Sequence, residues 1–341
     1  MDGIDVPKVT TWFEQHIAGA TGPLQFELIA GGRSNLTFRV TDAGGQNYVL
    51  RRPPLGHVLA TAHDMAREHR IISALAPTPV PVAPALGFCD DVEVNGAPFY
   101  VMAYVDGLIV RDPGSGNALA PEARSKAGQS LIDVLVAIHA VDPDDVGLGE
   151  LGRKEGYIAR QLKRWYSQFN QSKMREVPAV DEMHDFLSAH IPEQQGAAIV
   201  HGDYRLDNCM LSPEGDVLAV LDWEICTLGD PLADLGLLMV YWNDPDDRVA
   251  TLAGGGATTA EGFPRRNDLR AMYAAKSDRD LSHLDFYVAF GYWKLACILD
   301  GVYTRYAKGA MGSDGASWEA FGDSVIRLAE ASKAAAGSLA E

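Results

Sequence analysis

The hydrophobic pattern of the N-terminal part of the chain predicts a strand-rich region. Short apolar runs bounded by Gly, Pro, Asn or Asp predict strands at residues 26–30, 36–41, 47–51, 85–90 and 98–104. Apolar residues at helical spacing predict helices at residues 7–18 and 62–75. The prolines at 77, 79 and 81 exclude a helix there, so an extended connection is expected between the second helix and the last two strands.

From about residue 105 onward the pattern becomes mainly helical. Apolar residues at helical spacing predict helices at residues 121–140, 156–168, 183–189, 232–242, 267–275, 282–308 and 317–335. Two short apolar runs, residues 199–200 and 217–221, predict strands. We therefore expect an α+β protein with a strand-rich lobe over residues 1–104, a boundary near Val105 and a helical lobe over residues 105–341.

Composition narrows the class of protein. The chain has 341 residues, 47% of them hydrophobic, and a net charge of −17, which argues against a nucleic-acid partner because duplex binding needs a basic face. The four cysteines are far apart and the N-terminus has no hydrophobic leader, so a cytoplasmic protein is expected. The most apolar late stretch contains Lys294 and Asp300, which predicts a buried helix and no membrane span.

One stretch carries the candidate chemistry, the sequence H-G-D-Y-R-L-D-N at residues 201–208, followed by Asp222 at the end of an apolar run. Phosphoryl transfer to a hydroxyl needs a carboxylate that accepts the proton and oxygen ligands for the magnesium that bridges the nucleotide phosphates. Asp203 is the candidate base, and Asn208 and Asp222 are the candidate Mg²⁺ ligands. Arg205 is placed to neutralise charge on the transferring group. The alternative is that these side chains only cap turns.

The pattern H-G-D-x-x-x-x-N, with Leu221-Asp222-Trp223 further along, resembles the catalytic loop and D-F-G segment of protein kinases. It is similar to the aminoglycoside phosphotransferase family, the small-molecule relatives of those kinases. The resemblance implies a two-lobed protein-kinase-like fold with an antiparallel β-sheet small lobe and a mainly α-helical large lobe. It also implies ATP as phosphoryl donor, Mg²⁺ as cofactor and a small-molecule hydroxyl as substrate.

The same resemblance implies a nucleotide site in the small lobe. A glycine turn between two strands covers the phosphates in kinases, and Gly32, Ser34 and Asn35 occupy such a turn here, although an ordinary hairpin explains it as well. The strand ending at Arg51 matches the strand that carries a phosphate-binding Lys in kinases, and Arg also grips phosphate oxygens. Arg51 could equally be a solvated charge at a strand end.

Three further residues complete the implied nucleotide site. Glu68, on the predicted helix, corresponds to the kinase Glu that pairs with the strand cation, so we expect it within salt-bridge range of Arg51, about 4 Å. Met102 and Tyr104 lie where a kinase fold hinges between its lobes and where adenine meets the backbone. Glu224 adds a carboxylate near Asp222 whose role the sequence leaves open.

Within the family, three segments resemble the branch whose kinase-like domain is joined to some acyl-CoA dehydrogenases: residues 153–165, 99–102 and 221–235. This resemblance suggests a hydroxyacyl group or its CoA thioester as acceptor. Basic side chains for an anionic ligand are then expected among Arg160, Lys163, Arg164, Arg265 and Arg266. The alternatives are a kinase for an aminoglycoside, amino alcohol or sugar, and a nucleotide-binding regulatory module without turnover.

Overall fold

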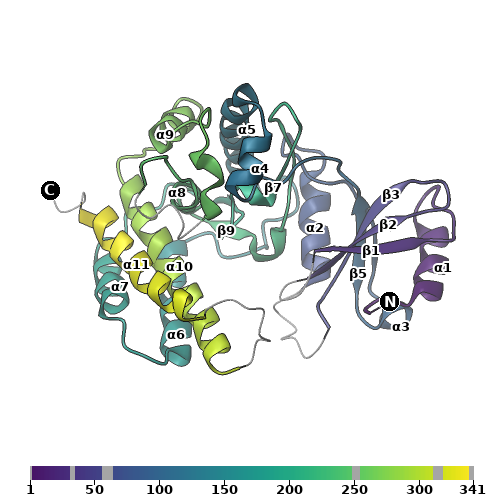
Figure 1. Ribbon diagram of the computed structural model, residues 1–341, viewed down its shortest axis with the longest axis horizontal. Helices are drawn as coiled ribbons and strands as arrows, with labels where there is room; N and C mark the ends of the chain where they lie inside the picture. Colours follow the sequence, from purple (N-terminus) through teal and green to yellow (C-terminus); the bar gives the residue numbers. More distant parts are fainter. Residues whose placement is uncertain (1, 31–34, 56–63, 248–253, 310–317, 338–341) are drawn as a thin grey trace. The chain divides into compact units, whose positions relative to one another are not determined.

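The computed structural model describes residues 2–30, 35–55, 64–247, 254–309 and 318–337. The chain divides into two compact units, each of which is described on its own (Figure 1). The first unit contains residues 1–108 together with residues 218–225, and the second contains residues 109–217 and 226–341. A short segment from the middle of the chain, which includes Asp222, therefore belongs to the N-terminal unit.

The first unit is built on a five-stranded antiparallel sheet in the order β1-β2-β3-β5-β4. Its strands are β1 (Gln25–Ala30), β2 (Leu36–Thr41), β3 (Asn47–Arg52), β4 (Ala85–Cys89) and β5 (Phe99–Ala103). In the register of β3 against β5, Leu50 lies opposite Val101 and Arg51 lies opposite Tyr100. Because successive side chains of a strand point to opposite faces, these two pairs lie on different faces of the sheet.

One face of this sheet carries the apolar core of the unit. Helix α1 (Val6–His16) contributes Phe13, which is buried in a cluster with Phe38, Leu50 and Val101 from the strands. The neighbouring position, Arg51, is directed to the other face, where helix α2 (Met65–Leu75) packs against β4 and β5. Strand alternation thus places a cation on the α2 side of the sheet. A four-residue helix, α3 (Val92–Asn95), lies between β4 and β5 in the chain, and the side chain of Asp91 caps its N-terminus.

The second unit is mainly helical. Its helices are α4 (Pro113–Ala118), α5 (Pro121–Ala140), α6 (Tyr157–Ser172), α7 (Pro178–Ala189), α8 (Leu232–Tyr241), α9 (Arg266–Ala274), α10 (Leu284–Ala307) and α11 (Trp318–Gly337). Short 3₁₀ turns cover Leu206–Asn208 and Gly254–Thr259, and a third, Trp223–Ile225, belongs to the first unit. The short strands are β6 (Ala198–Val200), which pairs with β9 (Thr227–Gly229), and β7 (Cys209–Leu211), while β8 (Val217–Val220) straddles the division between the units.

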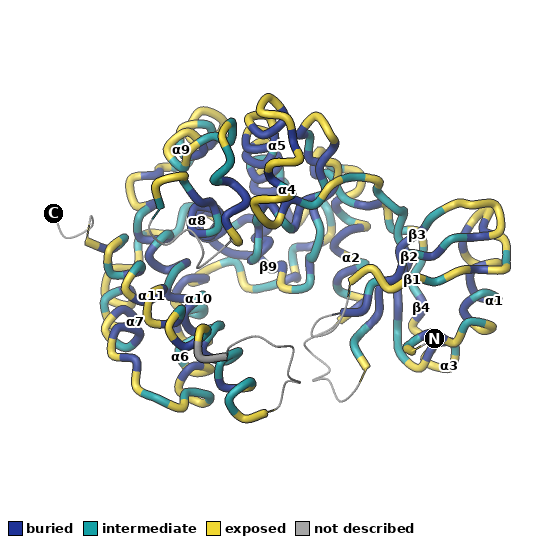
Figure 2. Tube along the Cα trace, in the orientation of Figure 1, coloured by how far each residue is buried: buried dark blue, intermediate teal, exposed yellow. Residues whose placement is uncertain are grey.

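Helices α8 and α10 pack closely, and this packing places the later helices beside residues 201–208. Nearly every residue of α8 is buried, as its dark trace in Figure 2 shows. Gly236 permits the contact, because a Cβ at that position would lie 2.5 Å from the Cβ of Tyr287 on α10. Helices α10 and α11 also run side by side (Figure 1). No helix within the described ranges is long and apolar enough to cross a membrane.

Candidate active site

The carboxylate of Asp203 is the centre of the H-G-D-x-x-x-x-N segment, which we call the HGD loop (residues 201–208). Its Oδ1 accepts a hydrogen bond from the Tyr241 hydroxyl at 3.0 Å. Its Oδ2 accepts one from the Asn208 amide nitrogen at 2.9 Å and lies 3.3 Å from Arg205 Nε. The side chain of Asp203 is 24% exposed, so three groups orient a carboxylate that a solvent-borne molecule can still reach.

The backbone of the HGD loop is held by a buried carboxylate, that of Asp234 on α8. Asp234 accepts hydrogen bonds from the backbone N–H groups of His201 at 2.6 Å and Gly202 at 2.8 Å. Gly202 has φ of +85°, a left-handed conformation that glycine adopts without strain. Burial alone would raise the pKa of Asp234, but the neighbouring His139, 3.7 Å away, and the hydrogen bond from the Gly202 N–H outweigh burial and lower that pKa.

Asn208 is oriented by two hydrogen bonds within the same loop. Its Nδ2 donates to the Asp203 backbone carbonyl at 2.8 Å and to the Asp203 carboxylate. An amide whose nitrogen is fixed in this way has its oxygen on the opposite side, which is the atom that a hard cation prefers. The chemistry of Asn208 therefore fits the predicted role of an Mg²⁺ ligand.

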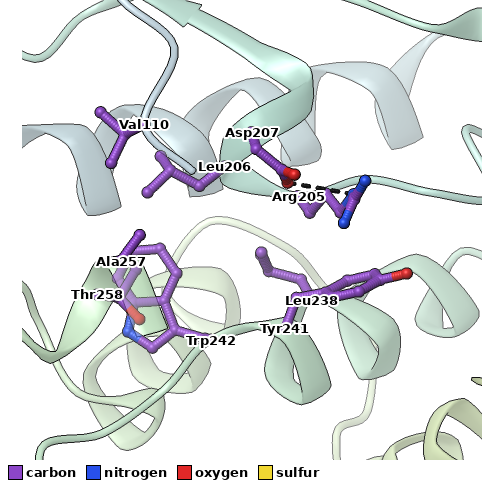
Figure 3. Close-up of a pocket in the computed structure, with 9 residues that line it drawn as sticks. All are labelled: Val110, Arg205, Leu206, Asp207, Leu238, Tyr241, Trp242, Ala257 and Thr258. Carbon is purple, nitrogen blue, oxygen red and sulfur yellow. Dashed lines mark ion pairs between the residues drawn. The ribbon is translucent and has the colours of Figure 1, made fainter. Parts of the chain in front are cut away.

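Arg205 lies between two carboxylates and an aromatic ring. Its Nε is 3.1 Å from Asp207 Oδ1, and its guanidinium lies 4.8 Å from the centroid of the Tyr241 ring (Figure 3). Burial raises the pKa of Asp207, while Arg205 opposes that rise. Burial also raises the pKa of Tyr241 well above its usual value, so its hydroxyl stays protonated and donates to Asp203.

A small pocket is lined in part by Arg205 and Asp207 (Figure 3). Its walls are mostly apolar or aromatic, with Leu238, Tyr241 and Trp242 contributed from α8 and the residue after it. The pocket has a volume of about 10 Å³, which is room for about one water molecule. It is therefore a packing gap behind the HGD loop and is too small for an acceptor.

In the first unit, Arg51 is the centre of a buried group of charges. One guanidinium nitrogen lies 3.2 Å from Glu68 Oε1, so the expected ion pair is present. The other lies 2.6 Å from Asp222 Oδ1 and 3.8 Å from Glu224 Oε2. The side chains of Arg51 and Glu68 are 11% and 2% exposed, which excludes the alternative of a solvated charge at a strand end.

The carboxylates around Arg51 set its charge state. Burial opposes the charged form, but Glu68 and then Tyr100 and Asp222 outweigh burial and raise the pKa of Arg51. Burial raises the pKa of Glu68, and Arg51 opposes that rise. Asp222 has φ of +62°, an uncommon conformation for a residue with a side chain and one that concentrates at functional sites.

The remaining predicted nucleotide residues are also in the first unit. Asn35 is buried, and its amide nitrogen donates to Glu224 Oε2 at 3.2 Å. Met102 lies on β5 opposite Val49 and Ala85, and Tyr104 follows the end of that strand. Gly32 and Ser34 lie outside the described residues.

The structure thus gathers Asn35, Arg51, Glu68 and Asp222 within the first unit, and Asp203, Arg205 and Asn208 within the second. Sequence reasoning missed Tyr241 and left Glu224 open. The only local signal for Tyr241 is a hydroxyl-bearing residue at the end of an otherwise apolar helix, which is also typical of an ordinary buried helix.

The basic residues that we expected to meet an anionic ligand are largely engaged with their own neighbours. Arg265 lies 3.4 Å from Asp246, and Arg266 pairs with both Asp247 and Asp244. Arg160 donates to backbone carbonyls of nearby residues. None of these contacts favours an anion-binding role for the three arginines.

Comparisons with known proteins place this geometry in context. Residues 25–270 match the sequence model of the Phosphotransferase enzyme family. The chain is 37% identical to mouse (Mus musculus) acyl-CoA dehydrogenase family member 10 over 297 residues, which is 86% of this chain and 28% of that protein. It is 36% identical to chicken (Gallus gallus) acyl-CoA dehydrogenase family member 11 over 325 residues, 93% of this chain and 41% of that protein. The chain thus spans well under half the length of these relatives.

Among solved structures, the chain resembles a candidate aminoglycoside phosphotransferase from Ralstonia eutropha. The two share 35% sequence identity and a TM-score of 0.82, with 98% of each chain covered. This likeness confirms the predicted α+β protein-kinase-like fold, with its antiparallel sheet in one lobe and its helices in the other.

Proposed function

This chain belongs to the phosphotransferase enzyme family, and we propose that it transfers the γ-phosphoryl group of ATP to a hydroxyl group of a small molecule. The observation that carries this proposal is the environment of Asp203. Its carboxylate is oriented by Tyr241 and Asn208 and is 24% exposed. A base that accepts a proton from an acceptor hydroxyl must be accessible in this way.

In the proposed reaction the acceptor oxygen attacks the γ-phosphorus while the bond from that phosphorus to the β–γ bridging oxygen breaks. Asp203 takes the hydroxyl proton, and ADP leaves with the bridging oxygen. Arg205 lies 3.3 Å from the Asp203 carboxylate and supplies positive charge beside the site of transfer. Tyr241 keeps the carboxylate pointed in one direction by donating to its other oxygen.

Magnesium fits the donor atoms that the chain offers, and we propose Asn208 and Asp222 as its ligands. Both supply oxygen, and the Asn208 nitrogen is already committed to Asp203. When bound, the ion would supply positive charge that offsets the negative charge of the nucleotide phosphates. Asp222 pairs with Arg51 at 2.6 Å, so the orientation of its carboxylate is fixed within the first unit.

We also propose that the nucleotide binds the first unit. Arg51, fixed by Glu68, is the candidate group for the α- and β-phosphates. Asn35, with the turn that contains Gly32 and Ser34, is proposed to cover the phosphates, and Met102 and Tyr104 are proposed to meet the base. We place the boundary between the two lobes near Val105 and expect the protein to act in the cytoplasm.

For the acceptor we favour a hydroxyacyl group or its CoA thioester. Support comes from relatives named for acyl-CoA dehydrogenases that are 36–37% identical to this chain. An aminoglycoside, amino alcohol or sugar is the second candidate, because the similar Ralstonia eutropha protein is a candidate aminoglycoside phosphotransferase.

The test is ATP consumption with Mg²⁺ and a panel of single acceptors. The panel contains 3-hydroxybutyryl-CoA, free 3-hydroxybutyrate, kanamycin, choline, ethanolamine and glucose, and mass spectrometry identifies any phosphate ester. We expect saturable formation of a phosphate ester from a hydroxyacyl compound. Phosphorylation of kanamycin alone would overturn the acceptor class and leave the kinase function in place. The absence of any ester with the whole panel and a broader set of alcohols would contradict the kinase function.

A further inference from the structure

Lys294 on α10 is a buried cation that neither the predicted chemistry nor the family comparison assigns. It is 6% exposed, and no carboxylate within the described ranges forms an ion pair with it. Its Nζ donates one hydrogen bond, to the backbone carbonyl of Gly202 at 2.9 Å. Lysine is rarely buried without a partner charge, because removing an ammonium group from water has a large free-energy cost.

The surroundings of Lys294 show what the charge faces. Its Nζ lies 5.8 Å from the centroid of the Trp165 ring, and Arg164 lies over the same ring at 5.0 Å. Burial lowers the pKa of Lys294, while the nearby carboxylates of Asp203 and Asp234 oppose that change. Two carboxylates of the HGD loop and its support, those of Asp203 and Asp234, therefore offset part of the effect of burial on Lys294.

The peptide group between Gly202 and Asp203 is fixed at both of its polar ends. Lys294 binds the Gly202 carbonyl, and the Asp203 N–H donates to His201 Nδ1 at 3.3 Å. Because a peptide group is planar and the Cα of the following residue lies in its plane, fixing both ends sets the position of the Asp203 Cα, from which the side chain departs. Asp234 adds a third restraint through the Gly202 N–H at 2.8 Å.

We propose that Lys294 is a positioning residue for phosphoryl transfer, whose ammonium fixes the Gly202 carbonyl so that the Asp203 carboxylate meets the acceptor hydroxyl. This inference rests on the proposed function. A methionine would fill the same space without the cost of a buried charge, so the charged group is explained by what it holds in place. Lys294 acts through Asp203 and does not touch the reacting atoms.

The kinetic test compares Lys294→Met and Lys294→Arg with the wild-type protein. With the panel acceptor that wild type phosphorylates, Lys294→Met should lower kcat about 100-fold, the loss expected when a catalytic group is displaced by about 1 Å. The KM for ATP should stay within about twofold, and the thermal midpoint should be unchanged or higher because a buried charge has been removed. Lys294→Arg should recover part of kcat.

The matched control is Asp300→Asn, which also replaces a buried ionisable side chain on α10. Asp300 is fully buried and has no hydrogen-bond partner within the described part of the chain. This variant should keep wild-type kcat. A Lys294→Met protein with kcat within about threefold of wild type would overturn the proposal. If Lys294→Met lost kcat and thermal midpoint together, and Lys294→Arg did not recover kcat, the role of Lys294 would be structural only. That result would also overturn the proposal.

A second measurement needs no acceptor. Hydrogen exchange read by mass spectrometry should show faster exchange of the HGD loop amides in Lys294→Met, with α5 and α8 unchanged. Unchanged exchange in the loop would contradict the proposed contact. If wild type phosphorylates no compound, the proposed function fails, and the exchange result still decides whether Lys294 holds the loop.

Discussion

Replacing Glu68 by glutamine should destabilise the first unit, because the substitution keeps the shape of the side chain and removes one charge from a buried ion pair. Glu68 is 2% exposed and lies 3.2 Å from Arg51. The amide oxygen of glutamine can still face the guanidinium, so the loss isolates the charge. The same substitution at Glu224 is the matched control, since that carboxylate faces the same guanidinium at 3.8 Å and is 24% exposed.

The structure sets the expected magnitudes. Breaking a buried ion pair from one side typically costs 3–5 kcal/mol, roughly, because the remaining charge is left uncompensated. Arg51 keeps Asp222 at 2.6 Å, so the cost for Glu68→Gln should lie at the lower end, about 3 kcal/mol. Glu224→Gln breaks a longer, partly solvated contact and should cost at most about 1 kcal/mol.

The assay is hydrogen exchange across a urea series, read by mass spectrometry in peptides from β3 and α2. These peptides report the free energy of unfolding of the first unit separately from that of the helical unit. A loss below about 1 kcal/mol in Glu68→Gln, or equal losses in the two variants, would refute the assignment of a buried, strongly coupled pair. Nucleotide binding should weaken in Glu68→Gln for the same reason, because Arg51 is then less firmly held.

Three further predictions concern the residues around Asp203 and the proposed metal. Asp222→Ala should abolish Mg²⁺-dependent turnover in steady-state assays, whereas excess Mg²⁺ should partly restore the activity of Asn208→Ala. Unchanged activity of Asp222→Ala at limiting Mg²⁺ would exclude Asp222 as a ligand. Tyr241→Phe removes the hydrogen bond to Asp203 Oδ1 and should lower kcat about tenfold, with an unchanged KM for ATP. The pKa of Asp234 is lowered in the folded protein, so this carboxylate stabilises the fold above about pH 4, and the stabilisation is lost as the pH falls through the lowered pKa. The free energy of urea unfolding of Asp234→Asn should therefore depend less on pH below about 4 than that of wild type. An unchanged pH dependence would contradict this expectation.

The sequence predicted those parts of the site whose residues lie close together in the chain or are paired in the family that the chain resembles. Asp203 and Asn208 are five residues apart, and their hydrogen bond closes within one loop. Arg51 and Glu68 were found through a resemblance that already pairs a strand cation with a helix carboxylate. The alternation of β3 explains why that pair forms, since Leu50 enters the core and Arg51 is directed to the face that carries α2.

The part that the sequence did not predict depends on long-range packing. Tyr241 reaches Asp203 across 38 residues, and Lys294 reaches Gly202 across 92 residues. Both depend on how α8 and α10 pack, and a close contact at Gly236 is not visible in a hydrophobic pattern. The pairing of Arg51 with Asp222 spans 171 residues and explains why residues 218–225 belong to the first unit.

The most direct test of the central claim is transfer of the γ-phosphoryl group from ATP to an acceptor hydroxyl by wild type and by Asp203→Asn, followed by phosphorus NMR. Asp216→Asn is the control, since that carboxylate pairs with Lys126 at the surface. We predict a phosphate monoester and an equal amount of ADP with wild type and Asp216→Asn, and no monoester with Asp203→Asn. Monoester formed by Asp203→Asn at the wild-type rate would contradict the role of Asp203 as the base that accepts the hydroxyl proton.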